Sequence, residues 1–151
     1  MAASKRQSIL AAVKTRLDAI TAGETYNTTP VIRDDQADAW NADEAVSIWC
    51  EMGDEEFEGL TFQAGTKVVC EINVNIMVRR SAGADLNSAA NGALQDVRNA
   101  LHANIDNWPT ECGATIQTLL TCTTDEGILS HDGKILFTQP VAFLYAAGPT
   151  W

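Results

Sequence analysis

The stretch that decides the fold is residues 67–80, KVVCEINVNIMVRR, in which apolar and polar side chains alternate. A period of two places alternate side chains on opposite faces of a β-strand. The apolar set is Val68, Cys70, Ile72, Val74, Ile76 and Val78. The stretch therefore predicts one long strand with one face on the core, a pattern typical of antiparallel sheets. The other face, which carries Asn73 and Asn75, is expected to be exposed to solvent or a partner.

Two segments on either side of this strand have helical periodicity instead. Residues 4–20 repeat apolar side chains at helical spacing, and Ser4 with Gln7 has the spacing of a capping box. Asp85 is expected to cap a second helix that extends to about residue 104. We therefore expect two principal amphipathic helices.

Further strands are predicted at residues 26–32, 45–52, 114–122 and 134–147. Residues 33–44 are polar and acidic and predict a loop around Trp40. Residues 53–59 place carboxylates between two glycines, which indicates a hairpin with an acidic tip. Pro140 lies inside the last strand, and because proline cannot donate a ladder hydrogen bond we expect an edge or a bulge there.

These segments predict an α+β fold, a mainly antiparallel or mixed β-sheet with two principal α-helices packed on one face. The chain has 151 residues, of which 46% are hydrophobic and 20% charged, and we expect one domain over residues 1–151. No stretch approaches the roughly 18 uninterrupted apolar residues of a membrane span, and the N-terminus lacks a signal-peptide pattern, so no membrane association is expected. Without an export signal, Cys50, Cys70, Cys112 and Cys122 are expected to be free thiols, mostly buried.

Charge and aromatic residues bear on possible partners. Ten basic residues against twenty acidic ones give a net charge of −10, which repels phosphate backbones and argues against specific nucleic-acid binding. Trp40, Trp49 and Trp108 are expected in the core. Trp151, at the end of the chain, is a candidate anchor on a neighbouring subunit.

Catalytic and metal-binding patterns are not found in the sequence. The two histidines are His102, on the second predicted helix, and His131, in a Ser130-His131-Asp132 turn. A catalytic triad normally draws its residues from separate loops, so this tripeptide is interpreted as a polar turn. The cysteines and histidines lack zinc spacing, and the acidic runs lack a calcium-loop pattern. The sequence predicts a protein that is not an enzyme and holds no metal or cofactor.

The order of these elements resembles the tail terminator (tail completion) proteins of long-tailed bacteriophages. The segments that carry the resemblance are the helix ILAAVKTRL at residues 9–17, the strand at 68–80, the helix at 85–101 and the closing strand at 137–145. The resemblance implies a structural virion protein of the tail or neck, assembled in the host cytoplasm. Such a protein forms a homohexameric ring that caps the tail tube, ends its polymerisation and joins the tail to the head connector.

The resemblance also implies partners and sites. The expected partners are further copies of the chain, the tail tube protein, the head-tail connector or stopper protein and the tape-measure protein, while DNA passes through the lumen without specific binding. Carboxylates are expected to line this lumen, and the candidates are Asp54, Glu55, Glu56 and Glu58. The candidates for contacts between subunits are Arg79, Arg80, Pro140 and Trp151.

Two alternatives remain open at this point. One is another phage neck or connector protein, such as a stopper, an adaptor or a tail tube subunit. The other is a small non-phage ligand-binding domain, with a pocket between the sheet and the helices.

Overall fold

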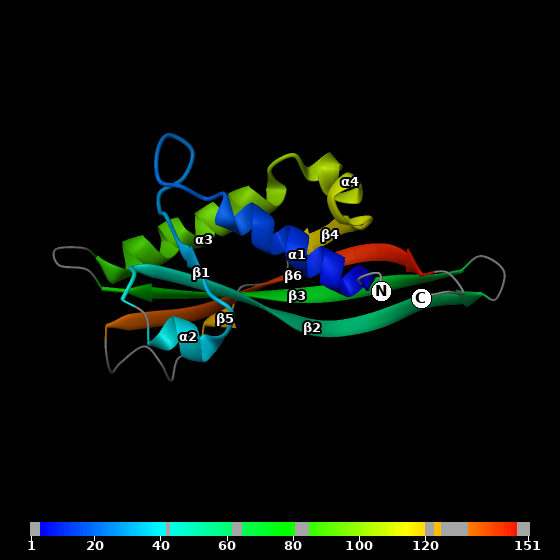
Figure 1. Ribbon diagram of the computed structural model, residues 1–151, viewed down its shortest axis with the longest axis horizontal. Coiled ribbons are helices and arrows are strands. Elements are labelled where there is room, and N and C mark those ends of the chain that lie inside the picture. The colour runs from blue at the N-terminus through cyan, green and yellow to red at the C-terminus, as the bar shows by residue number, and fades with distance from the viewer. Residues whose placement is uncertain are drawn as a thin grey trace.

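A mixed β-sheet with helices on both faces forms the fold in the computed structural model (Figure 1). The structure describes residues 4–41, 43–61, 65–80, 85–119, 123–124 and 133–147. The strands are β1 (Val31–Ile32), β2 (Val46–Thr61), β3 (Gly65–Arg79), β4 (Thr115–Leu119), β5 (Thr123–Thr124) and β6 (Lys134–Ala147). The helices are α1 (Lys5–Asp18), α2 (Gln36–Trp40), α3 (Leu86–His102) and α4 (Trp108–Cys112), with a 3-10 turn at Ile105–Asn107.

The strand order is β1-β2-β3-β6-β4, with β5 beside β6. Only β1 pairs in parallel, with β2, and the remaining described pairs are antiparallel. Both principal helices, α1 and α3, pack with α4 on one face of the sheet, which we call the helix face (Figure 1). The predicted α+β class and the placement of the two helices are confirmed.

The helices begin where their capping residues predict. The Ser4 hydroxyl accepts from the backbone N–H of Gln7, whose side chain accepts from the Ser4 N–H in return, so the capping box is complete. In α3 the Asp85 carboxylate accepts from the backbone N–H of Asn87. Both caps satisfy N–H groups that a helix leaves without partners in its first turn.

In β3, the side chains on the helix face are buried as predicted, but the side chains on the opposite face are not all exposed as predicted. All six predicted apolar side chains of β3 are fully buried on the helix face. On the opposite face, Trp49, Met77 and Leu136 pack with Ala39 of α2 in a second cluster. The expectation that Asn75 is exposed is wrong, because the residue is only 8% exposed and its side-chain carbonyl oxygen accepts from the Thr138 hydroxyl at 2.6 Å.

The acidic segment lies within β2 rather than at a hairpin tip. Pairing with β3 continues from Val46 to Thr61, with a register shift between Met52 and Glu55. A Cβ at Gly53 would lie 3.1 Å from the Cβ and the carbonyl oxygen of Glu71, so glycine permits close approach at this bulge. The predicted break at residue 53 is therefore a bulge that the strand passes through.

Other predicted boundaries need correction. The strand expected at 26–32 is reduced to Val31–Ile32, which is consistent with the limit that Pro30 places on pairing. Residues 33–44, predicted as a loop, contain α2. The strand at 114–122 is Thr115–Leu119 within the described residues. Pro109 lies in the first turn of α4, where a missing N–H costs nothing.

The expectation of an edge at Pro140 is wrong, because β6 lies between β3 and β4. Pro140 is opposite Asn73, and the N–H of Arg79, six residues later in β3, donates to β2. Backbone groups of alternate residues in a strand point to the same side, so the backbone groups of Asn73, like those of Arg79, bond to β2. Asn73 and Pro140 are therefore a non-hydrogen-bonded pair, and the Pro140 nitrogen faces away from β3. On that other side, pairing passes from β4 at Val141 to β5 at Thr138. The proline occupies the interval between these two short strands.

Three thiols are free and buried, as expected: Cys50, Cys70 and Cys112. Burial raises the pKa of Cys50 to about 12 and also raises the pKa values of Cys70 and Cys112. Thiols with raised pKa values stay protonated and unreactive. Cys122 lies outside the described residues. Among the described helices, none is both long and apolar enough to cross a membrane.

Candidate functional site

The bulge at Gly53 divides the predicted lumen carboxylates between the two faces of the sheet. Glu55 is opposite Cys70 and so lies on the helix face, whereas Glu56 is opposite Val69 and lies on the opposite face. Asp54 and Glu56 are exposed. The side chain of Glu58 lies outside the described residues. The predicted group is therefore not one surface, and Glu55 is separated from it.

Glu55 instead anchors the acidic part of β2 to the body of the protein. It accepts from the Tyr145 hydroxyl at 2.7 Å and pairs with Arg6 of α1 at 3.2 Å. Arg6 also donates to the carbonyl of Gly53 at 3.4 Å. Burial and the bond to Glu55 raise the pKa of Tyr145, which keeps its hydroxyl available as a donor. These contacts fix the position of β2 at the bulge.

The sequence prediction omitted two carboxylates on the opposite face. Glu51 is exposed and accepts from the indole N–H of Trp49 at 3.0 Å. Glu71 is half-buried beside Gly53. Alternation from Asn73 identifies Glu71 as an opposite-face residue in the sequence. Glu56 lies on this face only because of the bulge, and the only indication of the bulge in the sequence is Gly53.

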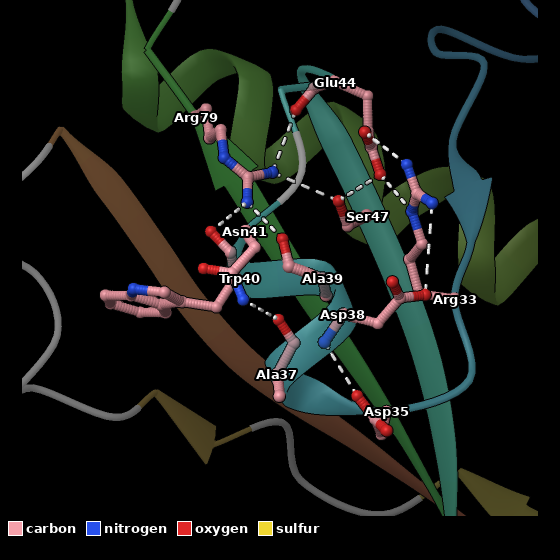
Figure 2. A network of polar contacts seen from close by, with 10 residues as sticks. All are labelled: Arg33, Asp35, Ala37, Asp38, Ala39, Trp40, Asn41, Glu44, Ser47 and Arg79. Carbon is pink, nitrogen blue, oxygen red and sulfur yellow. Dashed lines mark hydrogen bonds and ion pairs between the residues drawn. The ribbon is translucent and has the colours of Figure 1, made fainter.

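Arg79 is committed to contacts within its own chain (Figure 2). It donates to the carbonyl of Glu44 at 3.0 Å, to the Ser47 hydroxyl at 3.1 Å and to the carbonyl of Trp40 at 3.2 Å, and it also contacts the carbonyl of Ala39. The carbonyls of Ala39 and Trp40 lie at the C-terminal end of α2, where no further helical turn supplies N–H donors to them. Arg79 therefore holds the C-terminal end of α2 on the opposite face of the sheet.

A second arginine, Arg33, links the two ends of the segment that contains α2. Arg33 donates to both carboxylate oxygens of Glu44, at 2.7 and 2.9 Å, and Glu44 also accepts from Ser47 at 2.9 Å (Figure 2). The hydrogen bond from Arg33 is the main cause that lowers the pKa of Glu44 to about 2. The carboxylate of Asp35 caps α2 at its other end, accepting from the N–H of Asp38.

This network holds Trp40 at the surface rather than in the core. Trp40 is 36% exposed, and the ammonium of Lys134 lies 4.1 Å from the centroid of its ring. The prediction that Trp40 is a core residue is wrong, because α2 turns Ala39 inward and Trp40 outward. Trp49 and Trp108 are buried as expected.

Of the other predicted contact residues, Arg80 and Pro140 are described, and they lie apart. Arg80 is exposed, and its backbone N–H donates to the carbonyl of Gly133 at 2.7 Å. Pro140 lies further along β6, and Trp151 lies outside the described residues. Arg79 and Arg80 are therefore neighbours in sequence with different roles in the structure, since Arg79 is bonded internally and Arg80 presents its charge to solvent.

Within the described residues, no group of three or more histidine, cysteine, aspartate or glutamate side chains is placed to hold a metal ion. His102 is exposed at the end of α3, and the Ser130-His131-Asp132 turn lies outside the described part of the chain.

Comparison with known proteins gives little for this chain. No family model matches it, and no curated protein matches it. Among solved structures, it is similar to the sheath/tube terminator, in the extended state, of the extracellular contractile injection system PVC. The TM-score is 0.38 and the identity 13%, over 99% of this chain and 60% of that one. We draw no functional conclusion from similarity of this extent.

Proposed function

We propose that this protein is a non-enzymatic structural subunit of a phage-like tail, a terminator that caps the tail tube as a homohexameric ring. The observation that carries the proposal is the order and packing of its elements. An N-terminal helix, an acidic strand, a long alternating strand, a second helix rich in small residues and a closing strand follow one another, with both helices on one face. This is the order on which the resemblance to phage tail terminators rests.

The distribution of charge supports the same proposal. Most arginines bond to acceptors of their own chain, namely Arg6, Arg16, Arg33, Arg79 and Arg98. Many carboxylates are left at the surface, so the outside of each subunit is acidic. In a ring, Asp54, Glu56 and Glu58 would line the lumen and repel the DNA backbone, so that DNA passes without binding.

The ring would end polymerisation of the tube protein and offer its other face to the head-tail connector, with the tape-measure protein as a further partner. On this proposal the protein is part of the virion, in the tail or neck.

The experiment that tests this function combines mass with imaging. Purified protein would be measured by multi-angle light scattering over a range of concentrations, and then imaged by negative stain alone and with tail tubes of the same particle. We expect six-fold rings, either free or at one end of each tube. A protein that forms no ring and does not bind tube ends would contradict the proposal.

The lumen role is tested by removing exposed charge only. In the variant Asp54→Asn/Glu56→Gln, we expect normal rings but slower DNA ejection, because the DNA would meet less repulsion from the wall. Asp18→Asn/Glu24→Gln, which removes two exposed carboxylates near the end of α1, is the matched control. Equal ejection rates in both variants would exclude the lumen role. Glu55 is left unchanged because it holds β2 in place.

The contact role of Arg80 is tested separately from Arg79. We expect Arg80→Glu to shift rings toward monomers in sedimentation, while Lys14→Glu, a charge reversal on α1, leaves them intact. Rings that survive Arg80→Glu unchanged would remove Arg80 from the interface.

A further inference from the structure

The two edges of the sheet lie at the same height along the strands. Glu56 of β2 is opposite Val69, Val69 is opposite Leu144, and Leu144 is opposite Thr115 of β4. At the other end of β4 the row runs from Leu119 through Val141 and Ile72 to Met52. Residues 52–56 of β2 and all of β4 therefore occupy the same rows, on opposite edges.

Neither of these edge segments has a paired strand on its outer side among the described residues. β1 pairs only with Ser47 and Ile48, and β4 pairs only with β6. The carbonyl of Ile48 accepts from the Arg33 N–H on the outer side, so by the period of two the backbone groups of Cys50 and Met52 also point outward. An edge of this kind is a template for another strand.

Direction and charge favour the β4 edge of a second copy as the occupant. β2 and β4 run in opposite directions, because three antiparallel pairings separate them, so a second copy in the same orientation brings its β4 antiparallel to β2. The segment TIQTL of β4 carries no charge. Two β2 edges placed together would oppose Asp54 and Glu56 to their own counterparts, which is unfavourable.

We propose that β4 of one copy adds to the edge of β2 at residues 52–56 of the next copy, and that this antiparallel pairing closes the ring. Because the two edges lie at the same height, each addition rotates the next copy without raising it. Head-to-tail contacts without a rise close into a ring when the rotation between copies divides a full turn, whereas a difference in height would produce a helical filament. This inference rests on the proposed ring and names the contact that would build it.

The pairing predicts which side chains meet across the boundary. Glu56 and Thr115 are exposed and lie on the opposite face in the same row. Their backbone groups bond inward, to β3 and β6, so across the boundary they form the closer, non-hydrogen-bonded type of pair. Cysteines at these positions would therefore be well placed for a disulfide between copies.

The test is oxidation of the full chain carrying both Glu56→Cys and Thr115→Cys, followed by a non-reducing gel. We expect a ladder of crosslinked species that ends at the closed ring. The matched control is Glu51→Cys with Thr115→Cys, because Glu51 is exposed on the same edge and face but several rows away. Wild-type protein, oxidised in parallel, measures any contribution of the native cysteines.

Severalfold more crosslinking in the first pair than in the control supports the pairing. Equal crosslinking, or none in either pair, overturns it. Negative stain reports the ring independently, so rings without this crosslink overturn the strand pairing alone. Absence of crosslinks together with absence of rings, both free and at tube ends, would remove the proposed function as well.

Discussion

Among single residues, Asp96 carries an unusually large share of the polar contacts. It is 1% exposed on α3 and accepts from the backbone N–H groups of Asn27 and Thr28, the Asn27 amide and the Thr28 hydroxyl, at 2.6–3.0 Å. These bonds tie the segment before β1 to α3. No ion pair of Asp96 is found within the described part of the chain, and a buried carboxylate of this kind is stable when its oxygens are satisfied by hydrogen bonds.

We expect Asp96→Ala to lower the free energy of unfolding by about 3 kcal/mol, because it leaves several donors without an acceptor in a partly buried site. Urea unfolding followed by circular dichroism measures the loss. Asn99→Ala, at an exposed position of the same helix, is the control and should change stability little. A similar small effect in both variants would show that water replaces the carboxylate.

Glu44 predicts a specific dependence of stability on pH. Its pKa is lowered from 4.5 to about 2 in the folded protein, so its contact with Arg33 contributes stability above about pH 4.5 and loses it as the pH falls towards 2. We expect Glu44→Gln to be less stable than wild type at pH 7, with the difference shrinking through that range. Thermal unfolding at a series of pH values tests this, and a difference independent of pH would contradict it.

At the scale of elements, arginines secure the ends of two helices. Arg79 of β3 binds the last carbonyls of α2, and Arg16 of α1 donates to the carbonyls of Ala100 and Leu101 at the end of α3. Arg16 also lies over the Trp108 ring, 3.8 Å from its centroid, and pairs with Glu111 at 2.8 Å. In both cases a cation from another element satisfies carbonyls at the negative end of the helix dipole.

We expect Arg79→Met to release α2 from the sheet, because a helix of five residues has little stability of its own. Hydrogen exchange at residues 36–41 should become faster, and the fluorescence of Trp49 should shift as its cover loosens. Arg80→Met is the control. If exchange at α2 is the same in both variants, packing of Ala39 rather than Arg79 holds the helix.

These elements also show what the sequence could predict. The long strand, both principal helices and the bounds of β6 follow from periodicity and capping, which act over a few neighbouring residues. α2 does not, because five residues carry no readable period and its partner Arg79 is about forty residues away. The prediction that the acidic residues form one group was wrong for a similar reason. The bulge at Gly53 reverses the faces on which Glu55 and Glu56 lie, and the periodicity does not reveal it.

At the scale of the whole molecule, most arginines bond within their own chain, so copies that associate bring negatively charged surfaces together. Each copy carries −10, and copies in a ring repel one another over distances that salt screens, about 10 Å at 0.1 M. We therefore expect rings to be more stable at about 0.5 M NaCl than at about 0.05 M. Sedimentation at both salt concentrations measures this, and rings favoured by low salt would indicate attraction between oppositely charged surfaces instead.

The bulge at Gly53 has a genetic consequence. Before it, the even-numbered side chains of β2 lie on the helix face, and after it the odd-numbered ones do. Loss of the single codon for Gly53 would keep the reading frame and remove the extra residue together with the bulge, so Glu55 would still lie opposite Cys70 and every later side chain would keep its face. Substitution of Gly53 is the more harmful change, because a Cβ there would lie 3.1 Å from the Cβ of Glu71, and a strand that straightened without losing a residue would turn Asp54 and Glu56 into the apolar interior.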